Sequence, residues 1–403
     1  MPTVPFDPLS AETLEDPASE FKRLREQCPV HRSEQFGRPL YTLANTADIQ
    51  RVLLSPVVFS TRDGPGIPYD SGWSGDFNRY DPPEHTEWRR FVRPEFLRRT
   101  LSAYRDRIQT VAHHLIDAVA DAREGDLHDF FAYPLPVTIL IDLLGVPQTD
   151  AGRIKAWADE IALSIADPTA GEAAMMTSLA YIEELAQSRR EAADRAGVPG
   201  EEAVGAVVPE GWVSSYALRH FRGERLPMDE LCTLILSLII AGHETTSSLL
   251  TNLIWRLLER RELWQKLVSE PSLAEAAVEE SLRFDPPVLG LCRTNTEPVT
   301  IGAHQLPKGT KVLALYASAN RDPALYEDPD TFRLDRDLDT LRKHFSFGGG
   351  VHLCPGAVLA RDTGKIALEA LLGRLPSLRL NGETSRIEPA LLWGRRKLPV
   401  AWD

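Results

Sequence analysis

Apolar residues recur at intervals of three and four over most of the chain, which is the period of a helix with one buried face. Thirty prolines divide this pattern into separate segments, since proline starts helices but does not continue them. The predicted helices are 18–27, 46–54, 83–97, 101–122, 134–144, 150–164, 173–196, 228–260, 273–284 and 355–375. Most of the chain is therefore expected to be helical.

Strand patterns are short and gather in two places. One place is 40–43, near the N-terminus. The other lies late in the chain and comprises 299–301, 311–316 and the last dozen residues. The predicted fold class is mainly α with a small antiparallel β region. Because no repeat and no long Pro/Gly/Ser linker interrupts the chain, residues 1–403 are expected to form a single domain.

The segment 228–260 is the longest predicted helix, and about thirty residues at 1.5 Å each give a rod of roughly 48 Å. Its centre, AGHETT (241–246), is polar between the apolar runs LCTLILSLII and SSLLTNLIW. An unpaired buried polar group costs about 1–3 kcal/mol, so this centre is expected to face something. The twelve-residue apolar run 231–242 is shorter than the roughly twenty residues that span a bilayer, and no membrane partner is expected.

Composition narrows the class of protein. The net charge of −13 and the pI near 5.3 disfavour a nucleic-acid binder, which would be basic. Four cysteines without C-x-x-C spacing disfavour a disulfide framework or a zinc ribbon. The start MPTVPFDPLS has neither the basic region nor the apolar stretch of a signal peptide. These observations favour a cytoplasmic protein.

The segment FSFGGGVHLCPG (345–356) combines three glycines with Cys354 and a proline. Glycine lets a backbone adopt positive φ and run close to a flat group. Because Pro355 is typical of a first helical position, Cys354 is expected at a helix N-terminus, which favours a thiolate. Such a thiolate suits a single-cysteine iron ligand. A buried structural cysteine beside a helix cap is the alternative.

Five positions of this loop, Phe347, Gly350, His352, Cys354 and Gly356, resemble the haem-binding loop of the cytochrome P-450 family, Phe-x-x-Gly-x-His/Arg-x-Cys-x-Gly. The resemblance implies the cytochrome P-450 fold, with haem b (iron protoporphyrin IX) buried between the long central helix and the cysteine loop. It further implies that Cys354 is the proximal thiolate on the iron and that Phe347 packs beside the sulfur.

The centre of the long helix resembles the oxygen-activation segment of the same family. The small residues Ala241 and Gly242 leave room beside the helix, while Glu244 and Thr245 offer an acid and a hydroxyl. A hydroxyl that bonds back to the carbonyl one turn earlier bends a helix. The resemblance implies that Glu244 and Thr245 relay protons to oxygen. A polar helix patch with a surface glutamate is the alternative.

Two further sets match the family. Glu280 and Arg283, one turn apart on 273–284, correspond with Arg336 to a buried structural ion pair, although most such pairs are solvated surface bridges. The second set corresponds to cations that hold the haem propionates, which suit arginine. Its members are His85, Arg89, Arg293 and His352. The alternative for these four is scattered surface cations.

The resemblance implies a monooxygenase that inserts one atom of O2 into an apolar or aromatic small molecule, by hydroxylation or epoxidation in secondary metabolism. Since the chain has no G-x-G-x-x-G after a strand and no iron–sulfur cysteine cluster, electrons are expected from a ferredoxin with its ferredoxin reductase. Oxidative coupling, peroxide-driven oxidation and a haem-thiolate gas sensor are the alternatives.

Two surfaces complete the expectations. Basic residues that could meet an acidic partner are Arg89, Arg90, Arg93, Arg98, Arg99, Arg342, Lys343, Arg361 and Lys365; ordinary helix-surface arginines are the alternative. By family position the substrate pocket would draw on 64–80, 173–181, 236–245, 288–291 and 391–393. Apolar and aromatic residues there are Ile67, Tyr69, Trp73, Phe77, Met175, Met176, Val288, Leu289 and Trp393.

Overall fold

The computed structural model describes the chain except residues 1–4, 35, 68–75, 163–170 and 388–390. Most of the predicted helices are confirmed with their ends moved by one or two residues, and 163–164 lie outside the described residues. The α-helices are α1 Ala11–Glu15, α2 Pro17–Gln27, α3 Thr46–Leu54, α4 Glu84–Val92, α5 Arg98–Ser102, α6 Arg105–Asp117, α7 Pro134–Leu144, α8 Ala151–Ala162, α9 Glu172–Ala196, α10 Trp212–Leu218, α11 Met228–Glu259, α12 Arg261–Ser269, α13 Ala274–Phe284, α14 Tyr316–Ala319, α15 Leu338–Leu341 and α16 Ala357–Arg374.

Two predicted helices are wrong as continuous elements. The helix predicted at 83–97 ends at Val92 and continues as the 3₁₀ turn Arg93–Phe96, because Pro94 has no N–H to extend the α-helical ladder. The helix predicted at 101–122 is divided into α5 and α6, which are separated by Ala103 and Tyr104. Both breaks lie on the surface that carries the arginines of 89–99.

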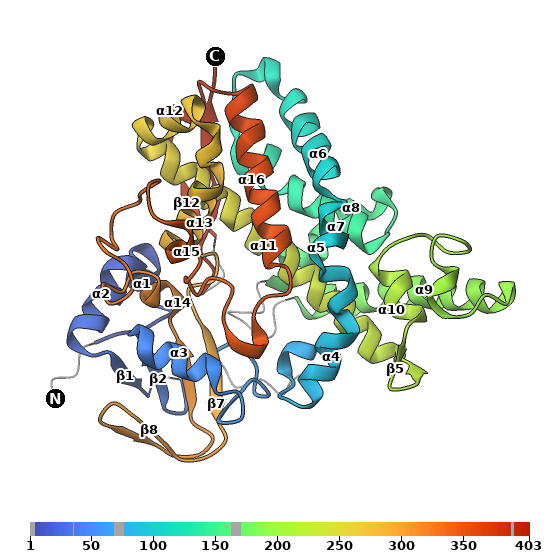
Figure 1. Ribbon diagram of the computed structural model, residues 1–403, viewed down its shortest axis with the longest axis horizontal. Coiled ribbons are helices and arrows are strands. Elements are labelled where there is room, and N and C mark those ends of the chain that lie inside the picture. Colours follow the sequence, from blue (N-terminus) through green and yellow to red (C-terminus); the bar gives the residue numbers. More distant parts are fainter. Residues whose placement is uncertain (1–4, 35, 68–75, 163–170, 388–390) are drawn as a thin grey trace.

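The largest sheet has the strand order β1-β2-β10-β7-β3. β10 pairs with β2 in parallel and with β7 antiparallel, so this one pairing departs from the antiparallel expectation. The sheet lies with α2 and α3 at the lower left of Figure 1, and the long helices fill the rest. The strands are β1 Val30–Ser33, β2 Leu40–Leu43, β3 Phe59–Ser60, β4 Glu124–Asp126, β5 His220–Phe221, β6 Glu224–Arg225, β7 Leu291–Asn295, β8 Val299–Ile301, β9 His304–Leu306, β10 Lys311–Ala314, β11 Arg379–Leu380, β12 Ser385–Arg386, β13 Arg395–Lys397 and β14 Pro399–Ala401.

The helix α11 is the axis of the helical core. It packs against α7, α9, α13 and α16, and the leucines and isoleucines before and after its polar centre are buried. By length and composition alone it could cross a membrane, and 67% of its most apolar window is buried inside the protein. Such burial is what a core helix of this length requires, since its apolar face needs a protein partner.

A buried ion pair fixes α13 to the segment before the cysteine loop. Arg283 Nε lies 2.7 Å from Glu280 Oε2, with both side chains fully buried, and Arg336 Nε lies 3.2 Å from Glu280 Oε1. The backbone N–H of Arg333 donates to the same carboxylate. The expected buried ion pair between Glu280 and Arg283 is thus confirmed, and the alternative of a solvated surface bridge is wrong.

Replacing Glu280 by Gln is expected to lower the free energy of unfolding by about 3–5 kcal/mol, because it leaves the guanidinium of Arg283 buried without a counter-charge. Urea unfolding followed by tryptophan fluorescence measures the change. Asp335→Asn is the matched control, since Asp335 pairs with Arg333 at the surface, and no measurable change is expected there. Equal effects of both substitutions would contradict the role given to burial.

Candidate functional site

The cysteine loop follows a backbone path that needs glycine. Gly348 and Gly350 have φ of +70° and +64°, a region that is strained for other residues. A Cβ on Gly350 would lie 2.4 Å from the carbonyl oxygen of Leu53, the penultimate residue of α3. The N–H of Cys354 donates to Phe347 O at 3.0 Å. The loop is therefore folded back on itself and pressed against α3.

The expected position of Cys354 at a helix N-terminus needs correction. The helix α16 begins at Ala357 with Gly356 as its N-cap, so Pro355 precedes the helix instead of opening it. Burial raises the pKa of the Cys354 thiol above its ordinary value, whereas the sequence analysis expected a lowered one. The N–H groups of Gly356 and Ala357 and the charges of Arg89 and Arg361 act in the opposite direction, since each favours the thiolate.

The polar centre of α11 has one open side. Most of the helix is buried, but Ala241 is exposed and Ser237 and Thr245 are half-exposed. These three residues are four apart, so they share one face. Thr245 Oγ1 donates to Ala241 O at 2.8 Å, which leaves the oxygen lone pairs free to accept a further hydrogen bond.

Glu244 lies beside this face and not on it, because neighbouring helical residues point in directions about 100° apart. Its residue is 8% exposed, so the surface-glutamate alternative is wrong. His243 Nε2 lies 3.9 Å from Glu244 Oε2. Gly242, on the α7 side, would carry a Cβ only 3.4 Å from Leu140. The segment thus supplies a buried acid, a hydroxyl and close helix packing.

All four expected propionate-binding residues, His85, Arg89, Arg293 and His352, lie close together. The imidazole rings of His85 and His352 have centroids 4.1 Å apart, and Arg89, one turn after His85 on α4, donates to Leu353 O at 2.9 Å. Arg293 is buried on β7 and donates to the carbonyl oxygen of Cys292. The reading of these four as scattered surface cations is therefore wrong.

The cluster has donor capacity that the protein leaves unused. The Nε2 atoms of His85 and His352 are buried, and neither has a hydrogen-bond partner among the described residues. Burial, together with the nearby positive charges of Arg89 and Arg293, lowers the pKa of His85 to about 4 and that of His352 to about 3. An acidic ligand group would relieve both effects, because it supplies the acceptors and the negative charge. These residues fit the two propionates of haem.

A second buried carboxylate on α13, that of Glu279, was not among the residues expected from the sequence. Glu279 Oε1 accepts from Arg361 Nε at 2.5 Å, and Glu279 Oε2 lies 3.0 Å from His344 Nε2. The Arg361 guanidinium carbon lies 4.5 Å from the centroid of the Phe347 ring. The doublet Glu279-Glu280 was the available signal, since two adjacent acids on a buried helix each need a partner.

The pocket segments are only partly brought together. Leu289 N donates to Leu391 O at 2.8 Å and Trp393 N to Pro287 O at 2.9 Å, so the segments around 288 and 392 run side by side. The side chains of Ile67, Phe77, Leu289 and Trp393 are buried. Met175 packs against the core, whereas Met176 is 62% exposed. Tyr69 and Trp73 lie outside the described residues.

Comparison with known proteins identifies the family. The family model described as "Cytochrome P450" matches residues 172–385. The chain is 32% identical over 411 residues to the cytochrome P450 monooxygenase PikC of Streptomyces venezuelae, covering all of this chain and 94% of that protein. It is 34% identical over 413 residues to the mycinamicin IV hydroxylase/epoxidase of Micromonospora griseorubida, covering 99% and 98%.

Similarity to a solved structure supports the same family. A mutant of P450 EryK in complex with erythromycin B has a TM-score of 0.84 and 29% identity, with 97% of each chain covered. The chain therefore belongs to the cytochrome P450 family. It has the cytochrome P450 fold, uses haem b, and is an oxidoreductase that incorporates oxygen from O2 into a small-molecule substrate with electrons from a redox partner.

Replacing Gly350 by Ala is expected to lower the free energy of unfolding by about 1–3 kcal/mol from backbone strain alone, and to reduce haem retention because the added Cβ drives the loop away from α3. Urea unfolding and the haem-to-protein absorbance ratio measure the two effects. Gly373→Ala is the matched control: Gly373 lies in α16 with nothing within 4 Å of an added Cβ, and there alanine stabilises by about 0.5–1 kcal/mol. A Gly350→Ala protein as stable as the parent would contradict the close approach.

Proposed function

We propose that the protein is a haem-thiolate monooxygenase in which Cys354 is the iron ligand. One observation carries the proposal. The half-buried Cys354 lies near the charges of Arg89 and Arg361. Arg89 also belongs to a cluster with His85, Arg293 and His352, and in this cluster the Nε2 atoms of both histidines have no hydrogen-bond partner among the described residues. A structural cysteine would not explain these two unpaired nitrogens, because buried polar groups are normally hydrogen bonded.

In this proposal Cys354 binds the iron, Phe347 packs beside the sulfur, and Gly350 and Gly356 let the loop approach the ring. His85, Arg89, Arg293 and His352 bind the two propionates. Haem, when bound, supplies the reductive activation of O2 and the transfer of one oxygen atom to the substrate. The backbone N–H groups of Gly356 and Ala357 stabilise negative charge on the sulfur.

The open face of α11 handles oxygen and protons. Ala241, exposed on this face, leaves space beside the helix for a diatomic molecule, whereas Gly242 faces Leu140 of α7 and does not provide the space expected from the sequence. Since Thr245 Oγ1 donates its hydrogen to Ala241 O, its lone pairs accept a hydrogen bond from a protonated oxygen species or from water. Glu244, buried next to His243, is the acid that resupplies the proton through ordered water.

The substrate is an apolar or aromatic small molecule. Several described residues of the expected pocket segments are apolar and buried, among them Phe77, Leu289 and Trp393. Pockets lined in this way bind ligands mainly by burying apolar surface. Two of the similar proteins are named for mycinamicin IV or were solved with erythromycin B. We infer a role in secondary metabolism and a cytoplasmic location.

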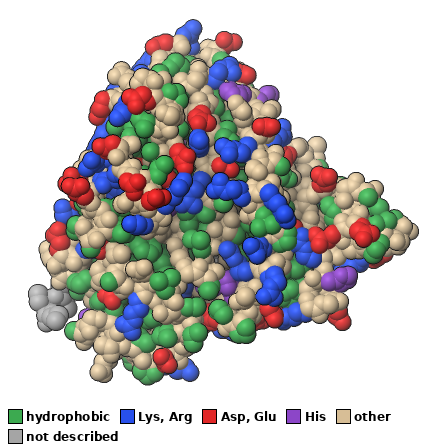
Figure 2. All heavy atoms as spheres, viewed as in Figure 1, with side chains coloured by type: hydrophobic (Ala, Val, Ile, Leu, Met, Phe, Trp, Pro, Cys, Tyr) green, Lys and Arg blue, Asp and Glu red, His purple; other side chains and the backbone are tan. Residues whose placement is uncertain are grey.

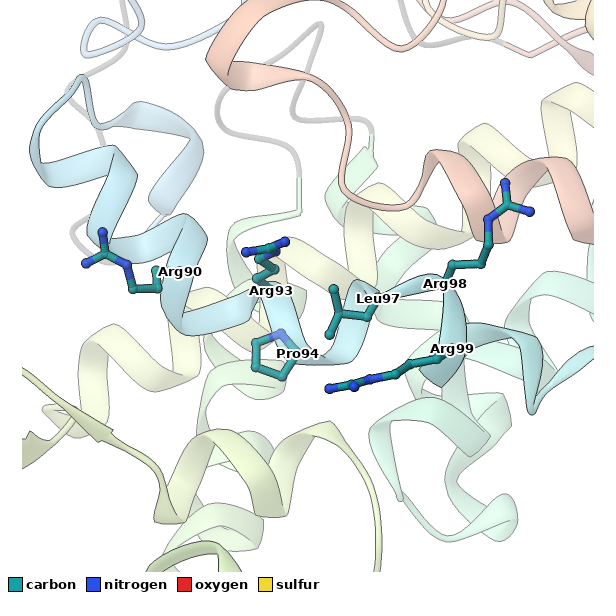
Figure 3. A pocket seen from close by; sticks show the side chains of 6 residues that line it. All are labelled: Arg90, Arg93, Pro94, Leu97, Arg98 and Arg99. Carbon is teal, nitrogen blue, oxygen red and sulfur yellow. The ribbon is translucent and has the colours of Figure 1, made fainter.

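An iron–sulfur ferredoxin, reduced by a ferredoxin reductase, supplies the electrons. On the face shown in Figure 2, Lys and Arg side chains gather over α4 and α5. A groove of about 540 Å³ lies there, and Figure 3 shows the side chains that line it. Its lining residues are Arg90, Arg93, Pro94, Leu97, Arg98 and Arg99. No ion pair holds these four arginines within the described part of the chain.

Three other basic residues of the expected docking surface differ from these four, whereas Lys343 is exposed and has no ion pair among the described residues. Arg342 pairs with Glu275 at 2.5 Å, Arg361 with Glu279 at 2.5 Å, and Lys365 with Glu369 at 4.0 Å. Charges that are already paired attract an incoming acidic protein less than free charges do. The groove arginines are therefore the docking residues in this proposal, and Arg361 is not one of them.

Turnover with O2, a ferredoxin and its reductase tests the function. Compounds that shift the Soret band are expected to yield products heavier by one oxygen atom, and the ferrous carbonyl spectrum is expected to show thiolate ligation. Thr245→Ala is expected to divert most electrons into hydrogen peroxide, because the hydroxyl that stabilises the protonated oxygen species is lost. The ratio of product to NADH consumed measures this coupling.

The outcomes separate the alternatives. Dimeric products without added oxygen would indicate oxidative coupling. Turnover with peroxide but not with ferredoxin would indicate peroxide-driven oxidation. Gas binding without any turnover would indicate a sensor. Full coupling in the Thr245→Ala protein would contradict the role of the hydroxyl.

Replacing both Arg93 and Arg99 by Gln is expected to slow reduction by ferredoxin about tenfold at low ionic strength, since steering by free charges is lost. Stopped-flow reduction at several salt concentrations measures the rate, and its salt dependence is expected to weaken. Arg342→Gln, which removes a charge already paired with Glu275, is the control. A loss as large in the control would contradict the assignment to the groove.

A further inference from the structure

The carboxylate of Glu279 is enclosed by basic groups from two other elements. Besides Arg361 Nε, it meets Arg361 Nη2 at 3.2 Å and Arg342 Nε at 3.9 Å. Its side chain is 2% exposed. Burial would raise the pKa of Glu279, but the hydrogen bonds from His344 and Arg361 outweigh it and hold the pKa at about 2. Glu279 therefore carries a full negative charge at neutral pH.

Both close partners of this carboxylate touch Phe347. The Arg361 guanidinium lies over the ring, and the His344 ring centroid is 5.8 Å from that of Phe347. His344 Nδ1 accepts from Ser346 N at 3.3 Å, so Nε2 carries the hydrogen and donates to Glu279. Phe347 O in turn accepts from the N–H of Cys354. A continuous set of contacts thus joins Glu279 to the residue proposed as the iron ligand.

We propose that Glu279 is a positioning residue for that ligand: its carboxylate holds the Arg361 guanidinium against Phe347 and offsets the positive charge that Arg361 would otherwise exert on the Cys354 sulfur. This inference rests on the proposed iron ligation by Cys354. It gives the two adjacent acids of α13 separate tasks, since Glu280 binds Arg283 and Arg336 whereas Glu279 binds Arg361 of α16.

The inference predicts in which direction each substitution shifts the reduction potential of the iron. A positive charge near the sulfur stabilises the ferrous state, which carries one more electron, and a negative charge destabilises it. Because the Arg361–Glu279 pair is buried on the Glu279 side, screening by water is weak there. Removing either partner should therefore shift the reduction potential of the iron, and the two shifts should have opposite directions.

The test is spectroelectrochemical titration of the purified holoprotein and three variants. Glu279→Gln should make the potential more positive, by about a tenfold change in the reduction equilibrium, or about 59 mV for one electron. Arg361→Gln should make it more negative by a similar amount. The double variant should return close to the parent value, because the net charge near the sulfur is restored.

Two controls separate charge from structure. Glu275→Gln removes the same charge from the same helix, but Glu275 pairs with Arg342 at the surface with 42% of its side chain exposed, so the potential should hardly change. Arg361→Lys keeps the charge and should also leave the potential unchanged. If Glu279→Gln fails to retain haem, the reduction potentials of Arg361→Lys and Arg361→Gln are compared instead. A potential that is more negative in Arg361→Gln and unchanged in Arg361→Lys supports the inference.

Shifts in the same direction for Glu279→Gln and Arg361→Gln, unchanged potentials in haem-loaded variants, or haem loss in both Glu279→Gln and Arg361→Lys would overturn the inference. The ferrous carbonyl spectrum of the unsubstituted protein tests the iron ligation separately. If that spectrum lacks the signature of thiolate, the proposed function fails before Glu279 is considered. If the signature is present and the potentials do not move as stated, only the role of Glu279 fails.

Discussion

Two adjacent buried carboxylates on α13 determine where the cysteine loop lies. Glu279 and Glu280 point in different directions because consecutive helical residues are rotated by about 100°. Glu280 meets Arg283 on the same helix and Arg336 on the incoming chain, while Glu279 meets His344 at the start of the loop and Arg361 on α16. Two like charges side by side in a protein interior are tolerable only when each is fully paired. This requirement links three segments that are distant in sequence.

The same logic explains why the core helix α11 has a polar centre. Its apolar ends bury against neighbouring helices, and helix burial of this kind supplies most of the stability of the element. At the centre, the hydroxyls of Thr245 and Thr246 donate hydrogen bonds to carbonyl oxygens one turn earlier. These two hydroxyls are thus satisfied within the helix, and the open face is left for oxygen and water. Stability and reactivity occupy different parts of one helix.

Local sequence signals predicted most of the helices and nearly all of the candidate site residues, since the cysteine loop, the AGHETT segment and the pair Glu280–Arg283 are each short and specific. What they could not predict depends on contacts between distant segments. The two-residue strand β3 exists through pairing with β7, and a strand of that length has no periodicity to detect. The start of α16 at Ala357 follows from the turn that Cys354 to Gly356 make within the loop, which proline propensity at Pro355 does not reveal.

The basic residues show most clearly what only the three-dimensional structure distinguishes. On a chain with a net charge of −13, Arg361 and Arg93 look alike in sequence, because each lies near a segment of the candidate site. Arg361 pairs with a buried carboxylate and lies over Phe347. Arg93, by contrast, lines an exposed groove and has no acidic partner in the part of the chain that the structure describes. The charge of Arg361 acts on a neighbouring group through a weakly screened environment, whereas the charge of Arg93 acts through solvent on an approaching protein. Counting charges near the cysteine loop therefore overstates the docking surface, and pairing within the fold decides which charges remain available to a partner.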